Sequence, residues 1–386
     1  MLNPADARPQ LLVTVLDWGM GHATRTLPLV EHAVSLGWTV HVASKGTALA
    51  WLASHLHAPH VHFHAKPGPD ITYSKRGNFF RIAGQIPSFL AHIRKERRWA
   101  EAFVRTHGVR AVLSDNCYGC AVPGVPSVLV SHQLQLPVPA LLEGAARAAV
   151  AKWAAAFDAV WVPDIEPGEG SLSGALADAH VHPHTAYVGV LSRLAPHAVQ
   201  RSLGDVPKPR TWVKVGMVSG VEPHRSLMEK ALRAWMAGTE GPCLVVAGKP
   251  GGGVHVDGNV TTWCDPTDTE LAHALQGAET VVCRSGYSSQ LDLAALGIRA
   301  ILVPTPGQPE QEFLAQLWAK RFGFTTVRQR DLEAGRLPER ATGAVPPTVA
   351  NAKAFGHLAT WLQAALTTSP TASSTPSPTS SQHERT

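Results

Sequence analysis

Short apolar runs recur along the chain, and each is followed by a glycine-containing or polar turn and then by residues with helical spacing. Such runs are typical of strands that are buried on both faces of a parallel sheet. The first run is 11–16, and Leu27, Val30 and Val34 then follow at the spacing of a helix that Gly37 ends. The same pattern predicts further strands at 39–43, 111–113, 127–130, 159–162, 187–190, 212–218, 244–247, 280–283 and 300–303.

The alternation of strands and helices runs through both halves of the chain, which predicts an α/β protein with two parallel-sheet domains. We expect the first domain to span 1–195 and the second 196–366, because the segment 192–209 is rich in proline, glycine and polar residues. The residues 367–386 are nearly all serine, threonine and proline, and we expect them to be disordered. The helix predicted just before them, at 351–366, has one apolar face and should dock.

The composition limits the possible classes of protein. With 386 residues, of which 45% are hydrophobic and 16% charged, the chain is neither disordered nor fibrous. The net charge of +5 suits phosphate-bearing ligands or an acidic membrane surface, and it is too small to indicate a nucleic-acid partner. No apolar run approaches the roughly 20 residues of a membrane-spanning helix, and the run 11–16 is too short for a signal peptide. We therefore expect a soluble, cytoplasmic protein that is at most peripheral to a membrane.

Three features favour a structural interpretation over a functional one. The residues 117–120 form one isolated Cys-x-x-Cys motif, and two reduced structural thiols are favoured there over a zinc or redox site. His60, His62 and His64 alternate along a predicted strand without a nearby cysteine or carboxylate, which favours a strand surface over a metal site. The segment 79–99 mixes apolar and basic residues, and a helix covering the first sheet is favoured over contact with anionic lipid.

Polar residues and glycines cluster just after the predicted strands, where open parallel sheets bind their ligands. The first strand is followed by the turn 19–22, which contains two glycines and His22. Backbone N–H groups in such a turn, together with the dipole of the following helix, suit an anion. Histidine titrates near neutral pH, so His22 is a candidate for proton abstraction. Arg25 lies one turn further on, at the spacing that would let it pair with a carboxylate or phosphate.

The segment 281–315 carries the densest set of such residues. Just after a predicted strand, 284–289 offers backbone N–H groups and hydroxyls at a helix start, which suits phosphate groups. Asp292 lies one turn into that helix, and a carboxylate there suits the two hydroxyls of a ribose. After the next strand, 306–312 is rich in Gln and Glu, whose side chains can each bond two sugar hydroxyls.

This segment resembles the donor-binding region of GT-B glycosyltransferases. It is most similar to the C-terminal domain of glycosyltransferase family 28, which includes the N-acetylglucosaminyltransferase that makes lipid II. That family carries, in order, Arg-Ser-Gly, a carboxylate six residues after the glycine, a further glycine, a strand ending in Val-Pro, and a Gln-rich loop. The chain matches this order with Arg284-Ser285-Gly286, Asp292, Gly297, Val303-Pro304 and Gln311-Glu312. The family has glutamate where this chain has Asp292, and glutamine where it has Glu312.

The chain also resembles a bacterial subgroup of such enzymes over about residues 11–365. That subgroup carries Ser-Asp-Asn, Ser-His-Gln, Ser-Gly-x-Glu-Pro, Arg-Ser-Gly-Tyr-Ser and Pro-Thr-Pro-Gly-Gln. In this chain these motifs are 114–116, 131–133, 219–223, 284–288 and 304–308. The turn 19–22 is similar to the Gly-rich N-terminal loop of the family, which also contains a histidine.

The resemblance implies a GT-B fold, with two facing Rossmann-like doubly wound domains, a cleft between them and a C-terminal helix that crosses back to the first domain. It implies the transfer, with inversion, of a hexose or N-acetylhexosamine from a nucleotide diphosphate sugar, most simply UDP-linked. The acceptor is a hydroxyl compound, either lipid-linked or a small molecule. No metal is expected, which fits the lack of an Asp-x-Asp motif, and no cofactor is expected, because the nucleotide sugar is a substrate.

The resemblance also implies roles for particular residues. His22 is the expected catalytic base. The nucleotide and its phosphates are expected to contact Ser219, Gly220, Arg225, Arg284, Ser285, Gly286, Ser288, Ser289 and Asp292. The donor sugar is expected at Gln308, Glu310, Gln311 and Glu312. The acceptor side is expected to comprise Gly19, Gly21, Arg25, Asp115, Asn116 and His132, although Asp115 and His132 are equally well explained as caps of strand ends.

Two other functions remain open. Nucleotide-sugar hydrolases of the same fold carry a similar Gly-x-Gly-His-x-x-Arg motif, here 19–25, in which the histidine activates water. A nucleotide-sugar-binding protein without catalysis would need Asp292 and would lose nothing when His22 is replaced. Rapid release of free sugar from a UDP-sugar alone would favour the hydrolase.

Overall fold

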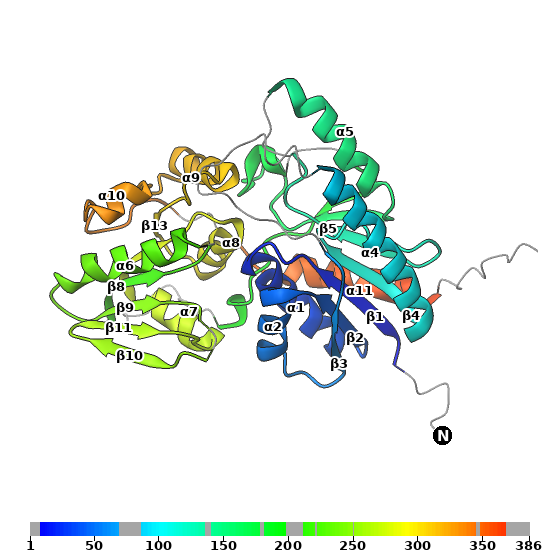
Figure 1. The fold of residues 1–386 in the computed structure, drawn as a ribbon, viewed down its shortest axis with the longest axis horizontal. Coiled ribbons are helices and arrows are strands. Elements are labelled where there is room, and N and C mark those ends of the chain that lie inside the picture. The colour runs from blue at the N-terminus through cyan, green and yellow to red at the C-terminus, as the bar shows by residue number, and fades with distance from the viewer. Residues whose placement is uncertain are drawn as a thin grey trace, which may run out of the picture.

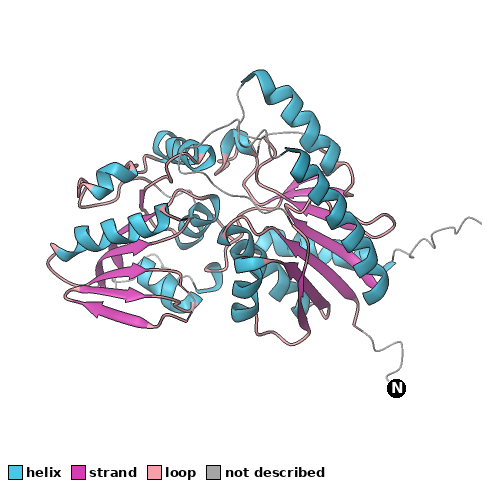
Figure 2. Cartoon of the chain, viewed as in Figure 1, coloured by secondary structure: helices cyan, strands magenta, loops and turns pink. Residues whose placement is uncertain are grey.

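A computed structural model describes residues 8–68, 86–135, 140–177, 181–197, 211–220, 222–249, 251–344 and 348–367. Two sheets lie side by side, each between layers of helices (Figures 1 and 2). The predicted α/β class is therefore confirmed. The predicted boundary segment falls partly outside the described residues, as does the predicted tail beyond Thr367.

The N-terminal sheet has seven parallel strands in the order β3-β2-β1-β4-β5-β6-β7. Their bounds are β1 Gln10–Val15, β2 Thr39–Ser44, β3 Val61–Ala65, β4 Val109–Asp115, β5 Ser127–Val130, β6 Ala159–Val162 and β7 Thr185–Tyr187. The direction in which the chain adds strands reverses between β1 and β4, which are direct neighbours. Such a reversal opens a crevice at the carboxyl ends of the strands, where ligands bind in doubly wound folds.

Helices cover both faces of this sheet. They are α1 (Met20–Ser35), α2 (Gly46–His55), α4 (Ile86–His107) and α5 (Glu143–Ala154). Alternate residues of β1 face opposite layers: Leu11 packs in the cluster that contains α1, whereas Leu12 packs against α4 with Phe103. This two-sided burial is why the β1 sequence is a nearly continuous apolar run.

The C-terminal sheet has the order β10-β11-β9-β8-β12-β13 and is parallel except for the β10–β11 pair. Its strands are β8 Trp212–Met217, β9 Cys243–Val246, β10 Val254–Asp257, β11 Val260–Trp263, β12 Ala278–Cys283 and β13 Ile301–Leu302. Its helices are α6 His224–Ala237, α7 Asp268–Gln276, α8 Tyr287–Leu296, α9 Pro309–Phe322 and α10 Gln329–Glu333, and α11 Ala352–Thr367 follows them. Short 3₁₀ turns lie at Ala140–Leu142, Gly174–Leu176 and Ala195–His197.

The two domains exchange elements. Helix α11, at the red end of the colour scale, returns to the N-terminal domain, where Leu358 and Leu362 join the core formed by β1 and α1 (Figure 1). In the opposite direction, Leu172 packs in the core of the C-terminal domain, and its carbonyl accepts a 2.9 Å hydrogen bond from Trp318 Nε1. These crossings fix where the carboxyl ends of the two sheets face each other.

The Cys-x-x-Cys motif forms a packed turn. Both thiols are free and buried, and burial raises the pKa of Cys117. A Cβ atom at Gly119 would lie 2.4 Å from the carbonyl oxygen of Ile93, so the turn approaches α4 more closely than any other residue would allow. The Gly119 N–H donates to Glu96, which also forms a buried 2.7 Å ion pair with Lys66. These contacts explain the motif by packing.

Within the described ranges, no group of three or more His, Cys, Asp or Glu residues is placed to hold a metal ion. No helix in the same ranges is long and apolar enough to cross a membrane.

The alternating histidines of β3 belong to a larger aromatic cluster. His41 on β2 has its Nδ1 atom 3.0 Å from His64 Nε2, and its ring lies 5.3 Å from His62 and 5.0 Å from His107 of α4. His60 precedes the strand, at a φ of 67°. Burial and the three neighbouring imidazoles lower the pKa of His41 to about 4.

We expect acid to destabilise the N-terminal domain through this cluster. The pKa of His41 is lower when folded than its ordinary value of 6.5, so the unfolded chain takes up the proton first and stability falls as the pH drops below 6.5. The loss should reach about 2 kcal/mol near pH 5. Urea unfolding of wild type and His41→Asn between about pH 7 and 5 tests this: the variant should show the smaller loss, and equal losses would contradict it.

Candidate functional site

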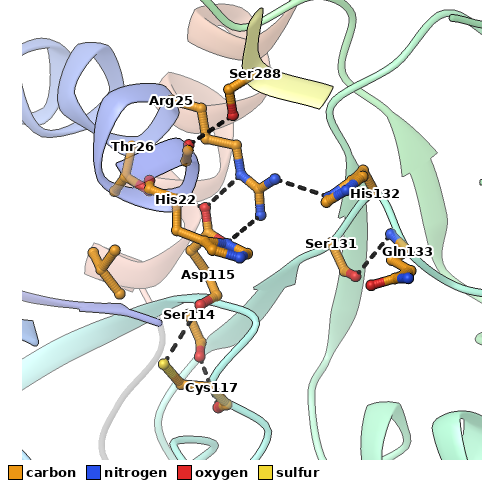
Figure 3. A network of polar contacts seen from close by, with 12 residues as sticks. His22, Arg25, Thr26, Ser114, Asp115, Cys117, Ser131, His132, Gln133 and Ser288 are labelled. Atoms are coloured by element: carbon orange, nitrogen blue, oxygen red, sulfur yellow. Dashed lines mark hydrogen bonds and ion pairs between the residues drawn. The ribbon is translucent and has the colours of Figure 1, made fainter. Parts of the chain in front are cut away.

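The ends of β1 and β4 meet where the N-terminal domain faces helix α8. Gly19 has a φ of 104°, a backbone conformation that favours glycine, and helix α1 begins directly after it. A Cβ atom at Gly21 would lie 2.6 Å from Ser288 Oγ, which donates a 2.9 Å hydrogen bond to the Gly21 carbonyl (Figure 3). The glycine turn therefore lets the start of α1 touch the start of α8 in the other domain.

A buried carboxylate organises the N-terminal side of the site. Asp115 accepts hydrogen bonds from Arg25 Nε at 2.7 Å and from Arg25 Nη2, and it contacts His22 Nδ1 at 2.7 Å (Figure 3). Burial alone would raise the pKa of Asp115, but the charge of Arg25 and the contact with His22 outweigh it and hold that pKa well below its usual range. Nδ1 of His22 also lies 2.8 Å from Arg25 Nη2, but that nitrogen already donates to Asp115. Because an ionised carboxylate can only accept, we assign the hydrogen of His22 to Nδ1. Nε2 of His22 is then left with a lone pair, as a general base requires.

His132 continues this network toward the other domain. Arg25 Nη1 lies 2.8 Å from His132 Nδ1, and because arginine can only donate, Nδ1 is the acceptor and Nε2 carries the hydrogen. Nε2 then donates to Glu310 Oε1 at 3.1 Å, across the domain interface. The His132 ring also stacks on Tyr287, with 4.1 Å between ring centroids. Burial lowers the pKa of His132, so the imidazole is neutral at neutral pH.

Most residues predicted on the acceptor side therefore come together. Arg25, Asp115 and His132 form one network with His22, in which Asp115 and His132 contact other side chains rather than simply capping their strands. Asn116 is separate: it adopts a φ of 54°, and its N–H donates to the Val130 carbonyl.

On the C-terminal side, the ends of β8, β12 and β13 are neighbours in the sheet. Gly220 is exposed after β8, with a φ of 98°, and Ser288 and Ser289 lie at the start of α8. Thr305 follows β13 with its Oγ1 atom buried and without a hydrogen-bond partner among the described residues. A Cβ atom at Gly220 would lie 3.6 Å from that hydroxyl. Because an unsatisfied buried hydroxyl is costly, Thr305 is a candidate ligand contact that we did not predict from the sequence.

Two predicted phosphate contacts do not fit their surroundings. The Arg284 guanidinium is fully buried and donates to the carbonyls of Val303 and His224 and to Gln329 Oε1, at 3.2, 2.7 and 2.9 Å. It ties strand ends to α6 and α10 and reaches no open surface. The hydroxyl of Ser285 is likewise buried and donates to the Gln311 carbonyl. The sequence shows that both residues follow a strand, but it does not show the direction in which their side chains point.

Arg225 and Gly286 have different surroundings. Arg225 Nη2 donates to the carbonyls of Ala247 and Gly248, at 2.5 and 2.7 Å, so its guanidinium lies at the end of β9. Gly286 is the N-cap of α8 and offers only backbone, which suits an anion at that helix start. Ser219 is partly buried just beyond β8.

Asp292 and the Gln/Glu loop lie near the domain interface. Asp292 Oδ1 accepts a 2.6 Å hydrogen bond from Ser192 of the interdomain connection, and burial raises the pKa of Asp292 to about 6. Gln311 bonds to Gln308 and to the Thr305 N–H, and Glu312 accepts from the Gly307 N–H. Of the four predicted sugar contacts, Glu310 is the one with a hydrogen bond to the N-terminal domain among the described residues.

Comparisons with known proteins agree with this architecture. Residues 261–354 match the glycosyltransferase family 28 C-terminal domain. Curated relatives are UDP-N-acetylglucosamine--N-acetylmuramyl-(pentapeptide) pyrophosphoryl-undecaprenol N-acetylglucosamine transferases. The one from Pseudomonas putida is 31% identical over 127 residues, or 31% of this chain and 35% of the relative. The one from Nocardioides sp. is 38% identical over 85 residues, or 22% of each. The matches thus span about a third or less of these relatives.

Solved structures match over most of the chain at low identity. The spinosyn rhamnosyltransferase SpnG superposes with a TM-score of 0.57 at 15% identity, over 85% of this chain and 90% of that one. The glycosyltransferase SnogD from Streptomyces nogalater superposes with a TM-score of 0.54 at 14% identity, over 94% and 96%. The predicted fold is confirmed: the chain has the GT-B glycosyltransferase fold, and its residues 261–354 match the family 28 C-terminal domain.

Proposed function

We propose that the protein is a glycosyltransferase that moves a hexose or N-acetylhexosamine from a nucleotide diphosphate sugar, most simply UDP-linked, to a hydroxyl acceptor. One observation carries the proposal. His22, oriented by the ionised Asp115, lies at the start of α1, which touches the start of α8 in the domain that matches family 28. A base and an anion-binding helix start thus face each other across the domain interface.

The chemistry follows from the tautomer of His22. Nε2 takes the proton of the acceptor hydroxyl while the hydroxyl oxygen attacks the anomeric carbon, and the bond to the nucleoside diphosphate breaks on the opposite side. The configuration at that carbon is therefore inverted. The imidazolium that forms is stabilised by Asp115, which accepts from its Nδ1–H.

The C-terminal domain supplies the donor site in this proposal. The negative charge of the leaving diphosphate meets the N-terminus of α8, the backbone of Gly220 and the unpartnered hydroxyl of Thr305. Asp292 takes the ribose, and the residues 308–312 hold the sugar. Backbone dipoles and hydroxyls perform the role that a metal would otherwise have, so we propose a metal-independent reaction.

The acceptor belongs to one of two classes. The curated relatives are named for a pyrophosphoryl-undecaprenol acceptor, which is lipid-linked, whereas structural neighbours such as the spinosyn rhamnosyltransferase are named for a small molecule. We propose a cytoplasmic protein with at most peripheral membrane contact. Arg94, Lys95, Arg97 and Arg98 are exposed on α4, and they are the groups that would meet an anionic surface.

A thermal-shift screen of nucleotide sugars is the first test of this function. Ligands that bind the native state raise the melting temperature, so UDP-glucose, UDP-N-acetylglucosamine and dTDP-glucose should separate into binders and non-binders. A binding donor is then incubated without acceptor. Slow release of free sugar supports a transferase, whereas rapid release identifies a hydrolase in which His22 activates water. A screen in which no nucleotide sugar raises the melting temperature would contradict the proposal.

Replacing Asp292 tests the nucleotide site. We expect Asp292→Ala to weaken UDP binding by about 1.5–3 kcal/mol, because a charged hydrogen bond to the ribose is lost. The pKa of about 6 adds a second signature, since the ionised carboxylate is the stronger acceptor and UDP affinity should fall as the pH drops below 6. Calorimetry of UDP binding to wild type and to Asp292→Asn across this pH range isolates the contribution of the carboxylate, because the titration of UDP itself affects both proteins equally. Equal affinities and equal pH profiles would reject the assignment.

A further inference from the structure

One hydrogen-bonded chain of side chains crosses from the N-terminal domain into the predicted sugar loop. It runs from Asp115 through Arg25 and His132 to Glu310, with contacts of 2.7, 2.8 and 3.1 Å. Figure 3 shows the Arg25 guanidinium between Asp115 and His132. Every member except Glu310 is buried, and the Glu310 side chain is 30% exposed. This series of hydrogen bonds thus ends on a carboxylate that is partly open to solvent.

The donor and the acceptor are fixed in each hydrogen bond of this series of side chains. Arg25 can only donate, so it fixes the tautomer in which His132 has its hydrogen on Nε2 and presents that hydrogen to Glu310. Stacking on Tyr287 of α8 holds the plane of the His132 ring. Burial would raise the pKa of Glu310, but its contacts outweigh burial, the hydrogen bond from His132 first among them, and lower that pKa, so the carboxylate is ionised. One oxygen of Glu310 is thereby held from the opposite domain.

We propose that His132 is an interdomain positioning residue. It holds the Glu310 carboxylate in the orientation that binds the donor sugar, and it does so only while the two domains are closed on each other. This inference rests on the proposed function and adds a regulation of the same site: the sugar part of the donor is recognised by a loop that the N-terminal domain completes. The nucleotide part is recognised by the C-terminal domain alone.

Two substitutions separate this role from a packing role. Glutamine has one acceptor and one donor on its amide, so His132→Gln can still accept from Arg25 and donate to Glu310. His132→Leu fills a similar volume and can do neither. A positioning role therefore predicts that His132→Gln retains the function that His132→Leu loses, whereas a role in proton transfer would be lost in both variants.

A second interdomain contact supplies the matched control. His55 of α2 has its Nε2 atom 3.7 Å from Asp265 of the C-terminal domain, so it is also a histidine–carboxylate pair across the interface. It involves neither the sugar loop nor the His22 network. His55→Leu therefore measures what loosening the interface does by itself.

The readout is the gain in affinity that the sugar provides. It is measured as the dissociation constant of the free nucleotide divided by that of its nucleotide sugar. The pairs are UDP with UDP-glucose or UDP-N-acetylglucosamine, and dTDP with dTDP-glucose. We expect His132→Leu to reduce this gain about tenfold, with the affinity for the nucleotide alone unchanged. His132→Gln should restore most of the gain, and His55→Leu should leave it at the wild-type value. Glu310→Gln should reduce the gain as well, and adding it to His132→Leu should have little further effect, because the pair acts as one unit.

Each outcome decides between interpretations. A gain that is unchanged in His132→Leu overturns the inference, as does an equal loss of nucleotide and nucleotide-sugar affinity or a loss that His55→Leu reproduces. Wild-type protein that binds neither nucleotides nor nucleotide sugars removes the proposed function, and the inference with it. Small-angle scattering on the same samples should show a donor-induced contraction in wild type and His132→Gln and a weaker one in His132→Leu.

Discussion

Replacing His22 by alanine is expected to lower turnover by about 10²–10⁴ while leaving the KM for the donor nearly unchanged. The reason is positional. His22 lies on α1 of the N-terminal domain, whereas the proposed contacts to the nucleotide lie at the ends of β8, β12 and β13. A group that acts only on the proton of the acceptor contributes in the transition state, so its loss appears in kcat.

Steady-state kinetics and thermal melting of one preparation test this result. If His22 served only to begin its helix, the variant would lose about 1 kcal/mol of stability and retain its turnover. Normal turnover with a lowered melting temperature would thus remove the catalytic role. The structure adds a control: Thr24 is a neighbour on α1 that bonds only to the Gly21 carbonyl among the described residues, and Thr24→Ala should leave kcat close to the wild-type value.

The strands that sequence reasoning located best are those buried on both faces. The segments predicted at 127–130 and 159–162 coincide with β5 and β6, because a doubly buried strand reads as an unbroken apolar run. The hairpin of β10 and β11 was missed, since all four residues of β10 are exposed and carry no such run. Strand β7 begins two residues before the predicted strand 187–190 and ends at the first residue of that prediction. The apolar residues Val188 and Val190, which favoured the prediction, are buried in an irregular connection instead of a strand.

The parts of the site that could be predicted are local, and the parts that could not depend on long-range contacts. The glycine turn and His22 are recognisable together because they are adjacent in the chain. The pairing of His22 with Asp115 joins residues 93 positions apart and arises from the neighbouring positions of β1 and β4. The burial of Arg284 and the unpartnered hydroxyl of Thr305 depend on how three strand ends and two helices pack, which no spacing rule describes.

Replacing Asp115 by alanine is expected to destabilise the fold by about 3–5 kcal/mol and to abolish turnover. Arg25 and Asp115 have side chains that are only 2% and 1% exposed, so the variant leaves a buried guanidinium without its counter-charge. Asp115→Asn has nearly the same shape and should unfold at a higher urea concentration than Asp115→Ala, yet it should lose turnover as well. A neutral amide no longer fixes the Nδ1–H tautomer of His22, and it stabilises the imidazolium poorly.

The double variant Asp115→Ala/Arg25→Leu separates charge from packing in this effect. Removing the guanidinium together with the carboxylate eliminates the unpaired buried charge, so the double variant should be more stable than Asp115→Ala alone. Urea unfolding of the three proteins at pH 7 measures the differences. Because the pKa of Asp115 lies below its ordinary range, the stabilisation is complete above that range and is lost only as the pH falls below about 4. An Asp115→Ala variant as stable as wild type at pH 7 would show that the Asp115–Arg25 pair does not hold the site together.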